Sequence, residues 1–352
     1  MAALLQTEDL AVDFATEDGV VHAVRGVSLA VEPGRMLGVV GESGSGKSVS
    51  MLTVMGLTRA ENATISGVAR FEGRDLLSLP NEELRTIRGN EIAMIFQDPL
   101  SSLHPFYKVG TQLIEAIQTH QDVSKRSARE RSIELLKMVG IPDPRGRVDA
   151  YPHEFSGGMR QRAMIAMALA NDPKVLIADE PTTALDVTVQ SQILDLIARL
   201  QRELDMAVVL ITHDLGVVAE HTDEIAVMYA GQVIETAPTD LIFKAPEHPY
   251  TWGLLQSIPR LDRPRDEPLI PIPGRPPSLI ALPSGCSFHP RCPYVRERHR
   301  RVEPGLDPVS DQSGHLVRCL LDSKIRREIW GELQKGQLPD AARARVKLEE
   351  RA

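Results

Sequence analysis

The chain of 352 residues is long enough for two domains, and its 42% hydrophobic and 25% charged residues are typical of a globular protein with a substantial core. Its formal net charge of −8 argues against nucleic acid as a partner, because phosphate binding normally requires net or clustered positive charge. The first residues show no secretory signal, and no apolar run approaches the ~20 residues of a membrane helix. We therefore expect a cytoplasmic protein that reaches a membrane only through partners.

The first part of the chain, residues 1 to about 95, predicts mainly β-structure. The stretch GVVHAVRGVSLAVEPGRMLGVVG, residues 19–41, alternates apolar and polar residues and then becomes continuously apolar, with a turn at Pro33 and Gly34. The last apolar run has the length of a buried strand, so a strand is expected directly before residue 41.

A glycine-rich loop follows this strand and precedes a helical pattern. Its sequence GESGSGKS, residues 41–48, matches the P-loop G-x-x-x-x-G-K-[ST] at every fixed position. Small residues let backbone N–H groups turn onto phosphate oxygens, while Lys47 reaches the outer phosphates and Ser48 can ligate Mg²⁺. A plain Gly/Ser turn is the alternative. The expected nucleotide contacts are Gly41, Glu42, Ser43, Gly44, Ser45, Gly46, Lys47, Ser48 and Val49.

Helical periodicity takes over from about residue 99 to 165, as in VGTQLIEAIQTH and RSIELLKMVGI. Near its end, Ser156, Gly157 and Gly158 stand before a long helical pattern and predict a second helix N-terminus suited to anions. Strand and helix then alternate from about residue 175 to 233, the pattern of a parallel sheet covered by helices.

Two strand ends in this alternating region carry candidate catalytic residues. The segment KVLIADEP, residues 174–181, reads as a buried strand that ends in Asp179 and Glu180. Asp179 suits Mg²⁺, and Glu180 would act on the water that attacks the γ-phosphate. An acidic pair beginning a turn is the alternative. His213 ends a further apolar strand, VLITHD, where a lone histidine can be merely a strand-end residue.

Together these motifs resemble those of ATP-binding cassette (ABC) ATPases, in the family's order over residues 38 to 214. FSGGMRQR resembles the signature motif, Gln97 the Q-loop glutamine, Thr183–Asp186 the D-loop at the dimer interface, and His213 the switch histidine. The resemblance assigns catalysis to Glu180, His213 and Gln97. It assigns the binding of Mg²⁺ to Ser48, Gln97 and Asp179. Further ATP contacts are expected from Phe14, Ser156, Gly157, Gly158 and Asp186. Phe14 would stack on adenine, and core packing explains it equally well.

The fold implied by this resemblance is an α/β P-loop NTPase cassette. It has a mixed-sheet core, an antiparallel β subdomain and an inserted α-helical subdomain at about 99–165. The expected division is a cassette at 1–240, an extension at 241–325 and a helical or flexible tail at 326–352. Only one copy of each motif is present, and the family's signature loop closes over the nucleotide of another subunit. We therefore expect a dimer with itself or with a paralogous ATPase subunit.

The composition changes after about residue 240, where proline-rich sequence begins. A disordered linker is one interpretation, but Tyr250 and Trp252 favour docking on a surface. PEHPYTWGLLQSIPRL, IPGRPPSL and GCSFHPRCPY resemble the C-terminal extension of ATPases of oligopeptide, dipeptide and nickel importers, especially the first ATPase of the pair. FQDPLSSLHP, residues 96–105, also matches them, with His104 in place of an asparagine where the permease would touch.

This second resemblance implies a subunit that hydrolyses ATP to import di- or oligopeptides or related small solutes. It would work with two integral membrane permease subunits and, indirectly, an extracytoplasmic substrate-binding protein. Its place would be the cytoplasmic face of the bacterial inner membrane, as a peripheral protein. The alternatives are a nickel importer, a soluble ABC ATPase of nucleic-acid or translation pathways, and a regulator that binds nucleotide without hydrolysis.

The three cysteines of the chain, Cys286, Cys292 and Cys319, fall on three of the four cysteine positions of this extension, and His299 stands at the remaining one. The resemblance implies a 4Fe–4S cluster. A Cys₃His set also suits tetrahedral Zn²⁺, and free thiols are the third interpretation. Any bound group would staple a tail that is expected to have little core of its own.

Overall fold

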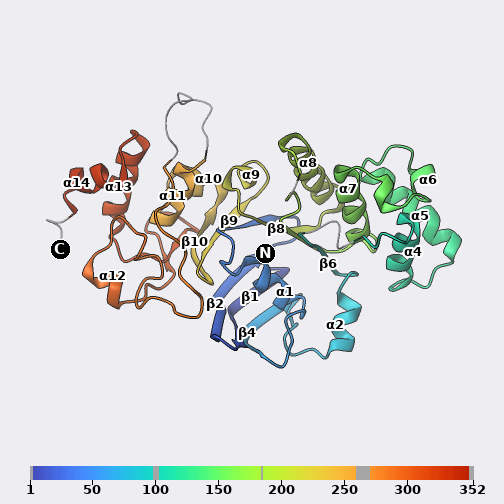
Figure 1. Ribbon diagram of the computed structural model, residues 1–352, viewed down its shortest axis with the longest axis horizontal. Helices are drawn as coiled ribbons and strands as arrows, with labels where there is room; N and C mark the ends of the chain where they lie inside the picture. Colours follow the sequence, from blue (N-terminus) through green and yellow to red (C-terminus); the bar gives the residue numbers. More distant parts are fainter. Residues whose placement is uncertain (1–2, 98–102, 184, 259–269, 349–352) are drawn as a thin grey trace.

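The central element of the fold is a mixed sheet of eight strands in the order β11-β12-β10-β9-β3-β8-β7-β6 (Figure 1). The computed structural model describes residues 3–97, 103–183, 185–258 and 270–348. The five parallel strands are β3 (Met36–Val40), β6 (Ile92–Ile95), β7 (Val175–Asp179), β8 (Ala207–Thr212) and β9 (Glu224–Tyr229). Every residue of β3, β7 and β8 is buried, as the apolar runs predicted, because helices cover one face of the sheet and a helix with a second, antiparallel sheet covers the other.

A second, antiparallel sheet has the strand order β2-β1-β4-β5 and lies below the central sheet in Figure 1. Its strands are β1 (Leu5–Thr16), β2 (Gly19–Val31), β4 (Ala63–Phe71) and β5 (Arg74–Asp75). Leu10, Val24 and Phe71 from this sheet share a buried hydrophobic cluster with Met51 of helix α1 (Lys47–Val54). This packing holds the helix that begins at the phosphate loop.

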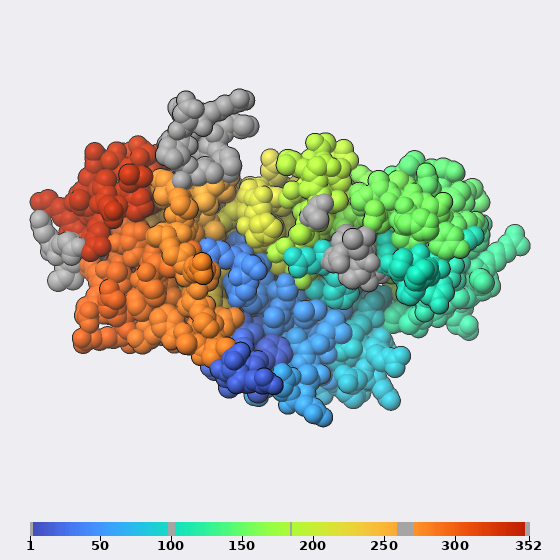
Figure 2. Space-filling model, in the orientation of Figure 1, coloured from blue at the N-terminus to red at the C-terminus, as the bar shows by residue number. Residues whose placement is uncertain are grey.

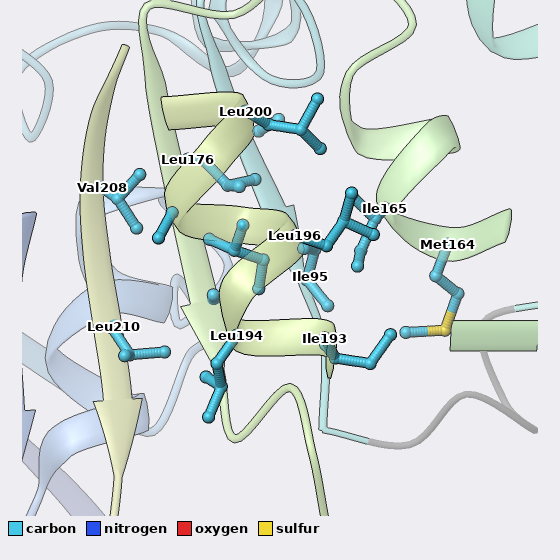
Figure 3. Packing of buried hydrophobic residues seen from close by; sticks show 14 of the residues in the cluster. Ile95, Met164, Ile165, Leu176, Ile193, Leu194, Leu196, Leu200, Val208 and Leu210 are labelled. Atoms are coloured by element: carbon cyan, nitrogen blue, oxygen red, sulfur yellow. The ribbon is translucent and has the colours of Figure 1, made fainter. Parts of the chain in front are cut away.

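A helical lobe at the right of Figure 1 contains the segment predicted to be helical, of which residues 98–102 lie outside the described residues. Its elements are α4 (Val109–Gln118), α5 (Lys125–Met138), α6 (Pro144–Arg147), η1 (Pro152–Glu154) and α7 (Gly157–Ala168). Figure 3 shows how α7 joins the sheet, since Ile165 lies beside Leu196 of α8 (Val187–Leu204) and Ile95 of β6. The lobe and the sheet therefore share one hydrophobic core.

Shorter elements connect the two sheets and lead out of the cassette. They are α2 (Asn81–Ile87), α9 (Leu215–Val218), β10 (Gln232–Pro238) and α10 (Thr239–Lys244). β10 pairs antiparallel with β9 and begins the antiparallel edge of the central sheet. Among the described residues no helix has the length and apolar character required to cross a membrane.

The C-terminal extension is folded and has a hydrophobic cluster of its own, contrary to the expectation of a tail with little core. Its elements are α11 (Pro249–Gln256), α12 (Glu297–Arg301), β11 (Asp307–Pro308), β12 (Leu316–Val317), α13 (Ser323–Gln334) and α14 (Pro339–Arg345). Trp252, Tyr294 and Ile329 are at most 2% exposed and centre this cluster, which α13 and α14 complete. The predicted boundaries at residues 240 and 325 remain predictions.

The extension is also continuous with the cassette. β12 pairs with β10, with Val317 opposite Glu235, so the extension adds two strands to the central sheet. The backbone N–H of His22 donates to the carbonyl of Leu279 at 3.0 Å, and Figure 2 shows the orange extension lying against the blue N-terminal strands. Residues 259–269 of the proline-rich stretch lie outside the described residues.

Candidate functional site

The phosphate loop joins the end of β3 to the start of α1, as predicted. Gly41 has φ of 155°, and a Cβ there would lie 2.2 Å from the carbonyl oxygen of Met228. Gly46 has φ of 97°, and its Cβ would lie 2.4 Å from the carbonyl oxygen of Ala23. Both positions therefore require glycine. Among the described residues, apart from Gly44 and its two chain neighbours, no atom lies within 4 Å of the Cβ that could be built at Gly44, so the loop has open space there for a ligand.

Lys47 lies across the inside of this loop and is 4% exposed. Its Nζ donates to the carbonyl oxygens of Gly41 at 2.7 Å and Glu42 at 3.0 Å. Burial lowers the pKa of Lys47, and the negative charges of Glu180, Asp179 and Glu42 oppose that shift. The ammonium group is thus held by neutral carbonyls in a loop that suits phosphate oxygens.

Ser48 and Asp179 meet where the phosphate loop faces the end of β7. The hydroxyl of Ser48 donates to Oδ1 of Asp179 at 2.8 Å, and Asp179 is 5% exposed. Burial raises the pKa of Asp179, and the Ser48 hydrogen bond opposes this rise. A hydroxyl and a carboxylate in contact are hard oxygen donors beside a phosphate loop, so these residues fit Mg²⁺.

Three side chains converge on one carboxylate oxygen of Glu180. Its Oε2 accepts from Nε2 of Gln97 at 2.9 Å and from Oγ1 of Thr183 at 2.9 Å, and Nδ1 of His213 lies 3.5 Å away. The contacts with Gln97 and His213 arise because β6, β7 and β8 are parallel neighbours whose C-terminal ends share one edge. The sequence pattern did not single out Thr183 as a partner of Glu180, although Thr183 begins the predicted D-loop. Ala184 of that loop lies outside the described residues.

Glu180 itself has a left-handed backbone, with φ of 44°. This conformation costs a residue with a side chain about 1–2 kcal/mol. The Glu180 N–H donates to the carbonyl of Ile211 at 2.9 Å, which ties the strained residue to the end of β8. The chain therefore turns sharply after Asp179. As a result the Asp179 carboxylate contacts Ser48, whereas the Glu180 carboxylate contacts Gln97 and Thr183.

The predicted signature residues lie elsewhere. Ser156 caps α7, with its Oγ accepting from the N–H of Met159 at 3.3 Å, and Gly157 and Gly158 form the first turn of that helix. In Figure 1, α7 lies with the helical lobe and α1 with the antiparallel sheet. Across the described part of the chain, no hydrogen bond or ion pair links these three residues to the phosphate loop.

Three other predicted nucleotide contacts have structural partners in this chain. Asp186 caps α8, with its carboxylate accepting from the N–H of Val189 at 3.0 Å. Phe14 lies on β1 and Val49 on α1, and both are partly buried against the hydrophobic cluster between the antiparallel sheet and α1. The core-packing interpretation of Phe14 is therefore satisfied by its surroundings.

The extension contributes two contacts to the phosphate loop that the sequence pattern did not reveal. Arg291 donates from both terminal nitrogens to Glu42, at 2.7 and 3.0 Å. The Glu42 N–H donates to the hydroxyl of Tyr250 at 3.0 Å. In the sequence, Tyr250 and Arg291 were marked only by their places in two motifs of the extension, HPYTW and HPRCPY.

Comparisons with known proteins agree with this geometry. The family model described as ABC transporter matches residues 24–183, and the one described as oligopeptide/dipeptide transporter, C-terminal region, matches residues 234–298. The oligopeptide transport ATP-binding protein OppD of Bacillus subtilis is 48% identical over 345 residues, which cover 98% of this chain and 94% of that relative. The chain belongs to the ABC transporter ATP-binding proteins.

Other relatives and solved structures of ABC proteins extend the match. The dipeptide transport ATP-binding protein DppD of Escherichia coli is 51% identical over 317 residues, covering 90% of this chain and 96% of the relative. The ATP-binding cassette MJ0796, solved as a dimer in a post-hydrolysis state with ADP and Pi, has a TM-score of 0.60 at 26% identity, covering 67% of this chain and 98% of that one. The predicted cassette fold with its antiparallel and helical parts is confirmed, and so is the family's ATPase activity with ATP and Mg²⁺.

The prediction of an iron–sulfur cluster or zinc ion in this ABC protein is wrong. In residues 270–348, which include Cys286, Cys292, His299 and Cys319, and throughout the other described residues, no group of three or more His, Cys, Asp or Glu side chains could hold a metal ion. Cys286 belongs to the main core, while Cys292 and Cys319 pack against the cluster around Trp252. Nδ1 of His299 instead accepts from the backbone N–H of Arg296 at 3.1 Å.

The three thiols are desolvated in the folded extension. Burial raises the pKa of Cys286, of Cys292 and, to about 11, of Cys319. Desolvation favours the neutral thiol over the thiolate. The cysteines therefore serve as small apolar side chains in a packed extension.

Alkylation kinetics test this assignment. At neutral pH, the Cys319 thiolate is expected to be roughly 100-fold scarcer in the folded than in the unfolded protein, so iodoacetamide should react correspondingly slowly until urea is added. Because the pKa rises from 9.0 to about 11, the stabilisation from this thiol is present below about pH 9 and lost as the pH rises through about 11. Three thiols that react equally fast with and without urea, or stoichiometric iron or zinc in the purified protein, would contradict the assignment.

Proposed function

We propose that this chain is the ATP-hydrolysing subunit of an importer for di- or oligopeptides. The observation that carries the catalytic part is the convergence of Gln97, Thr183 and His213 on one oxygen of Glu180, beside an intact phosphate loop. The peptide substrate follows from the relatives, which are named oligopeptide and dipeptide transport ATP-binding proteins.

In this proposal each part of the site has one chemical role. The loop from residues 41 to 48 binds the phosphates of ATP through backbone N–H groups, and Lys47 exchanges its carbonyl partners for phosphate oxygens. Ser48, Asp179 and Gln97 would hold Mg²⁺, which would supply charge neutralisation at the phosphates. Val49, on α1 directly after this loop, and Phe14, on β1, would complete the ATP contacts.

Glu180 accepts a proton from the water that attacks the γ-phosphate. Its Oε2 already gathers two hydrogen-bond donors, which orient the carboxylate and leave Oε1 to face the water. His213, 3.5 Å from the same oxygen, contacts the γ-phosphate and senses whether it is present. Gln97 connects Glu180 to the segment that leads into the helical lobe.

A second ATPase subunit completes the site in this proposal. In the part of the chain that the structure describes, Ser156, Gly157 and Gly158 form no hydrogen bond to their own phosphate loop, and in this proposal they supply a helix N-terminus for the γ-phosphate of the other subunit. Asp186 is the last residue of the D-loop, which would lie at this interface. The partner is a second copy or a paralogous ATPase.

The remaining partners are two integral membrane permease subunits, with an extracytoplasmic substrate-binding protein acting indirectly. The chain would lie at the cytoplasmic face of the inner membrane. A soluble ABC ATPase that acts on nucleic acid is the competing function, and the net charge of −8 counts against it.

Reconstitution tests the proposal. The chain is co-expressed with its two membrane subunits and second ATPase, purified, and placed in proteoliposomes with the binding protein. ATP hydrolysis is expected to rise several-fold when a mixture of short peptides is added, and not when NiCl₂ is added. Failure to co-purify with membrane proteins, or stimulation by Ni²⁺ alone, would contradict the proposed function.

A further inference from the structure

An ion pair joins the C-terminal extension to the phosphate loop over a large sequence separation. The side chain of Arg291 is 5% exposed and that of Glu42 is 28% exposed. The two terminal nitrogens of Arg291 donate to the two carboxylate oxygens of Glu42, at 2.7 and 3.0 Å, which is the bidentate geometry that favours arginine over lysine.

Glu42 is closely coupled to the part of the loop that binds phosphate. Its carbonyl oxygen accepts from Nζ of Lys47 at 3.0 Å, and its negative charge acts on the Lys47 ammonium. An unpaired carboxylate at this position would repel the charged phosphates of ATP and compete with them for Lys47. The pairing with Arg291 removes that repulsion.

Arg291 is itself held rigidly by the extension. Its Nε donates to the carbonyl of Pro273 at 2.8 Å, and its guanidinium lies 5.8 Å from the centre of the Tyr229 ring. Tyr250, whose hydroxyl accepts from the Glu42 N–H, packs against Tyr229 with ring centres 4.8 Å apart. Loop and extension are therefore connected through both the side chain and the backbone of Glu42.

The extension is anchored to the cassette close to this contact. Arg25 on β2 donates to the hydroxyl of Ser287 at 3.0 Å and to the carboxylate of Glu303 at 2.9 Å. Together with the pairing of β12 and β10, these bonds fix the extension relative to the loop. Because the extension is fixed in place, its residue Arg291 is held where it can neutralise the charge of Glu42 in the phosphate loop.

We propose that Arg291 is a positioning residue for ATP binding: by neutralising and orienting Glu42, it lets the phosphate loop accept a triphosphate. The C-terminal extension thereby sets the affinity of the cassette for ATP. This inference rests on the proposed function, because it assumes that ATP is the ligand of the loop.

Nucleotide affinity of the purified full-length chain tests the inference, with fluorescent ATP, ADP and adenosine analogues as probes. Arg291→Ala is expected to raise the Kd for ATP about tenfold, the Kd for ADP by less, and the Kd for adenosine hardly at all, because the repulsion grows with phosphate charge. The double variant Arg291→Ala with Glu42→Gln should restore ATP affinity to within about threefold of the wild type, because it removes the uncompensated charge.

Two further variants separate positioning from folding. Arg291→Lys keeps the charge without the bidentate geometry and should fall between wild type and Arg291→Ala. Arg296→Ala is the matched control, since it removes a positive charge from the extension at a residue that bonds to Leu348 and not to the loop. It should leave ATP affinity unchanged, and melting temperatures recorded for each variant identify any that fail to fold.

The outcomes distinguish the two proposals. Unchanged ATP affinity in folded Arg291→Ala, an equal loss for ATP and adenosine, or no rescue by Glu42→Gln would overturn the inference and leave the proposed function standing. A wild-type chain that binds none of the phosphorylated probes would overturn both.

Discussion

Replacing Glu180 with glutamine is expected to lower the rate of ATP hydrolysis at this site by about 100-fold or more while leaving ATP binding intact. Glutamine has nearly the same shape, and its amide oxygen can still accept hydrogen bonds from Gln97 and Thr183. It cannot take up the proton of the attacking water at neutral pH. The loss should therefore appear in the chemical step alone.

Single-turnover hydrolysis in the assembled transporter measures this effect, and a nucleotide titration of the same preparation measures binding. The matched control is Glu203→Gln, which removes a carboxylate from the exposed side of α8 where Glu203 pairs with Arg199. The control should hydrolyse ATP like the wild type. If Glu180→Gln also hydrolysed at the wild-type rate, Glu180 would not be the base, and the convergence of donors on it would have to be structural.

The second large effect is expected from the buried ion pair that joins α13 to the segment between α10 and α11, within the extension. Nε of Arg326 lies 2.6 Å from Oε2 of Glu247, and their side chains are 7% and 1% exposed. Arg326→Met keeps the apolar stem but leaves Glu247 buried, with the half-exposed Arg327 as its remaining ion-pair partner among the described residues. Breaking such a pair from one side costs about 3–5 kcal/mol of unfolding free energy.

Urea unfolding followed by tryptophan fluorescence measures this loss. The chain has two tryptophans, Trp252 and Trp330, whose ring centres lie 6.5 Å apart, so the signal reports on the extension itself. Arg327→Met is the control on the same carboxylate, because the Arg327 side chain is 46% exposed, and its loss should cost about 1 kcal/mol or less. If Arg326→Met and Arg327→Met lowered the free energy of unfolding equally, burial would not be what makes the Arg326–Glu247 ion pair the stronger of the two.

The main parts of the ATPase could be predicted from the sequence because each depends on local chain geometry. A phosphate loop needs glycine at positions where a side chain cannot fit, and Gly41 and Gly46 stand at two such positions. Buried parallel strands need continuous apolar runs, so β3, β7 and β8 were evident together with the polar residues that follow them. Family motifs extended this prediction to the whole cassette.

The extension was predicted less well because its contacts connect residues that are distant in the chain. Nothing in the spacing of the cysteines distinguishes metal ligands from buried thiols, and His299 occupied a ligand position in the sequence but bonds to the backbone at Arg296. The proline-rich composition also concealed the cluster around Trp252, which forms only when α11, α13 and α14 meet.

The sequence by itself predicted the nucleotide, the reaction and the loops that carry them, because each motif spans a few consecutive residues and together the motifs resemble those of ABC ATPases. Only the tertiary structure decided that Gln97 and His213 share one oxygen of Glu180, because the order of strands in the sheet places three separate strand ends together. It alone also brought Arg291 to Glu42 across 249 positions of sequence. Such a contact depends on how the extension docks on the cassette, and local periodicity contains no record of that docking.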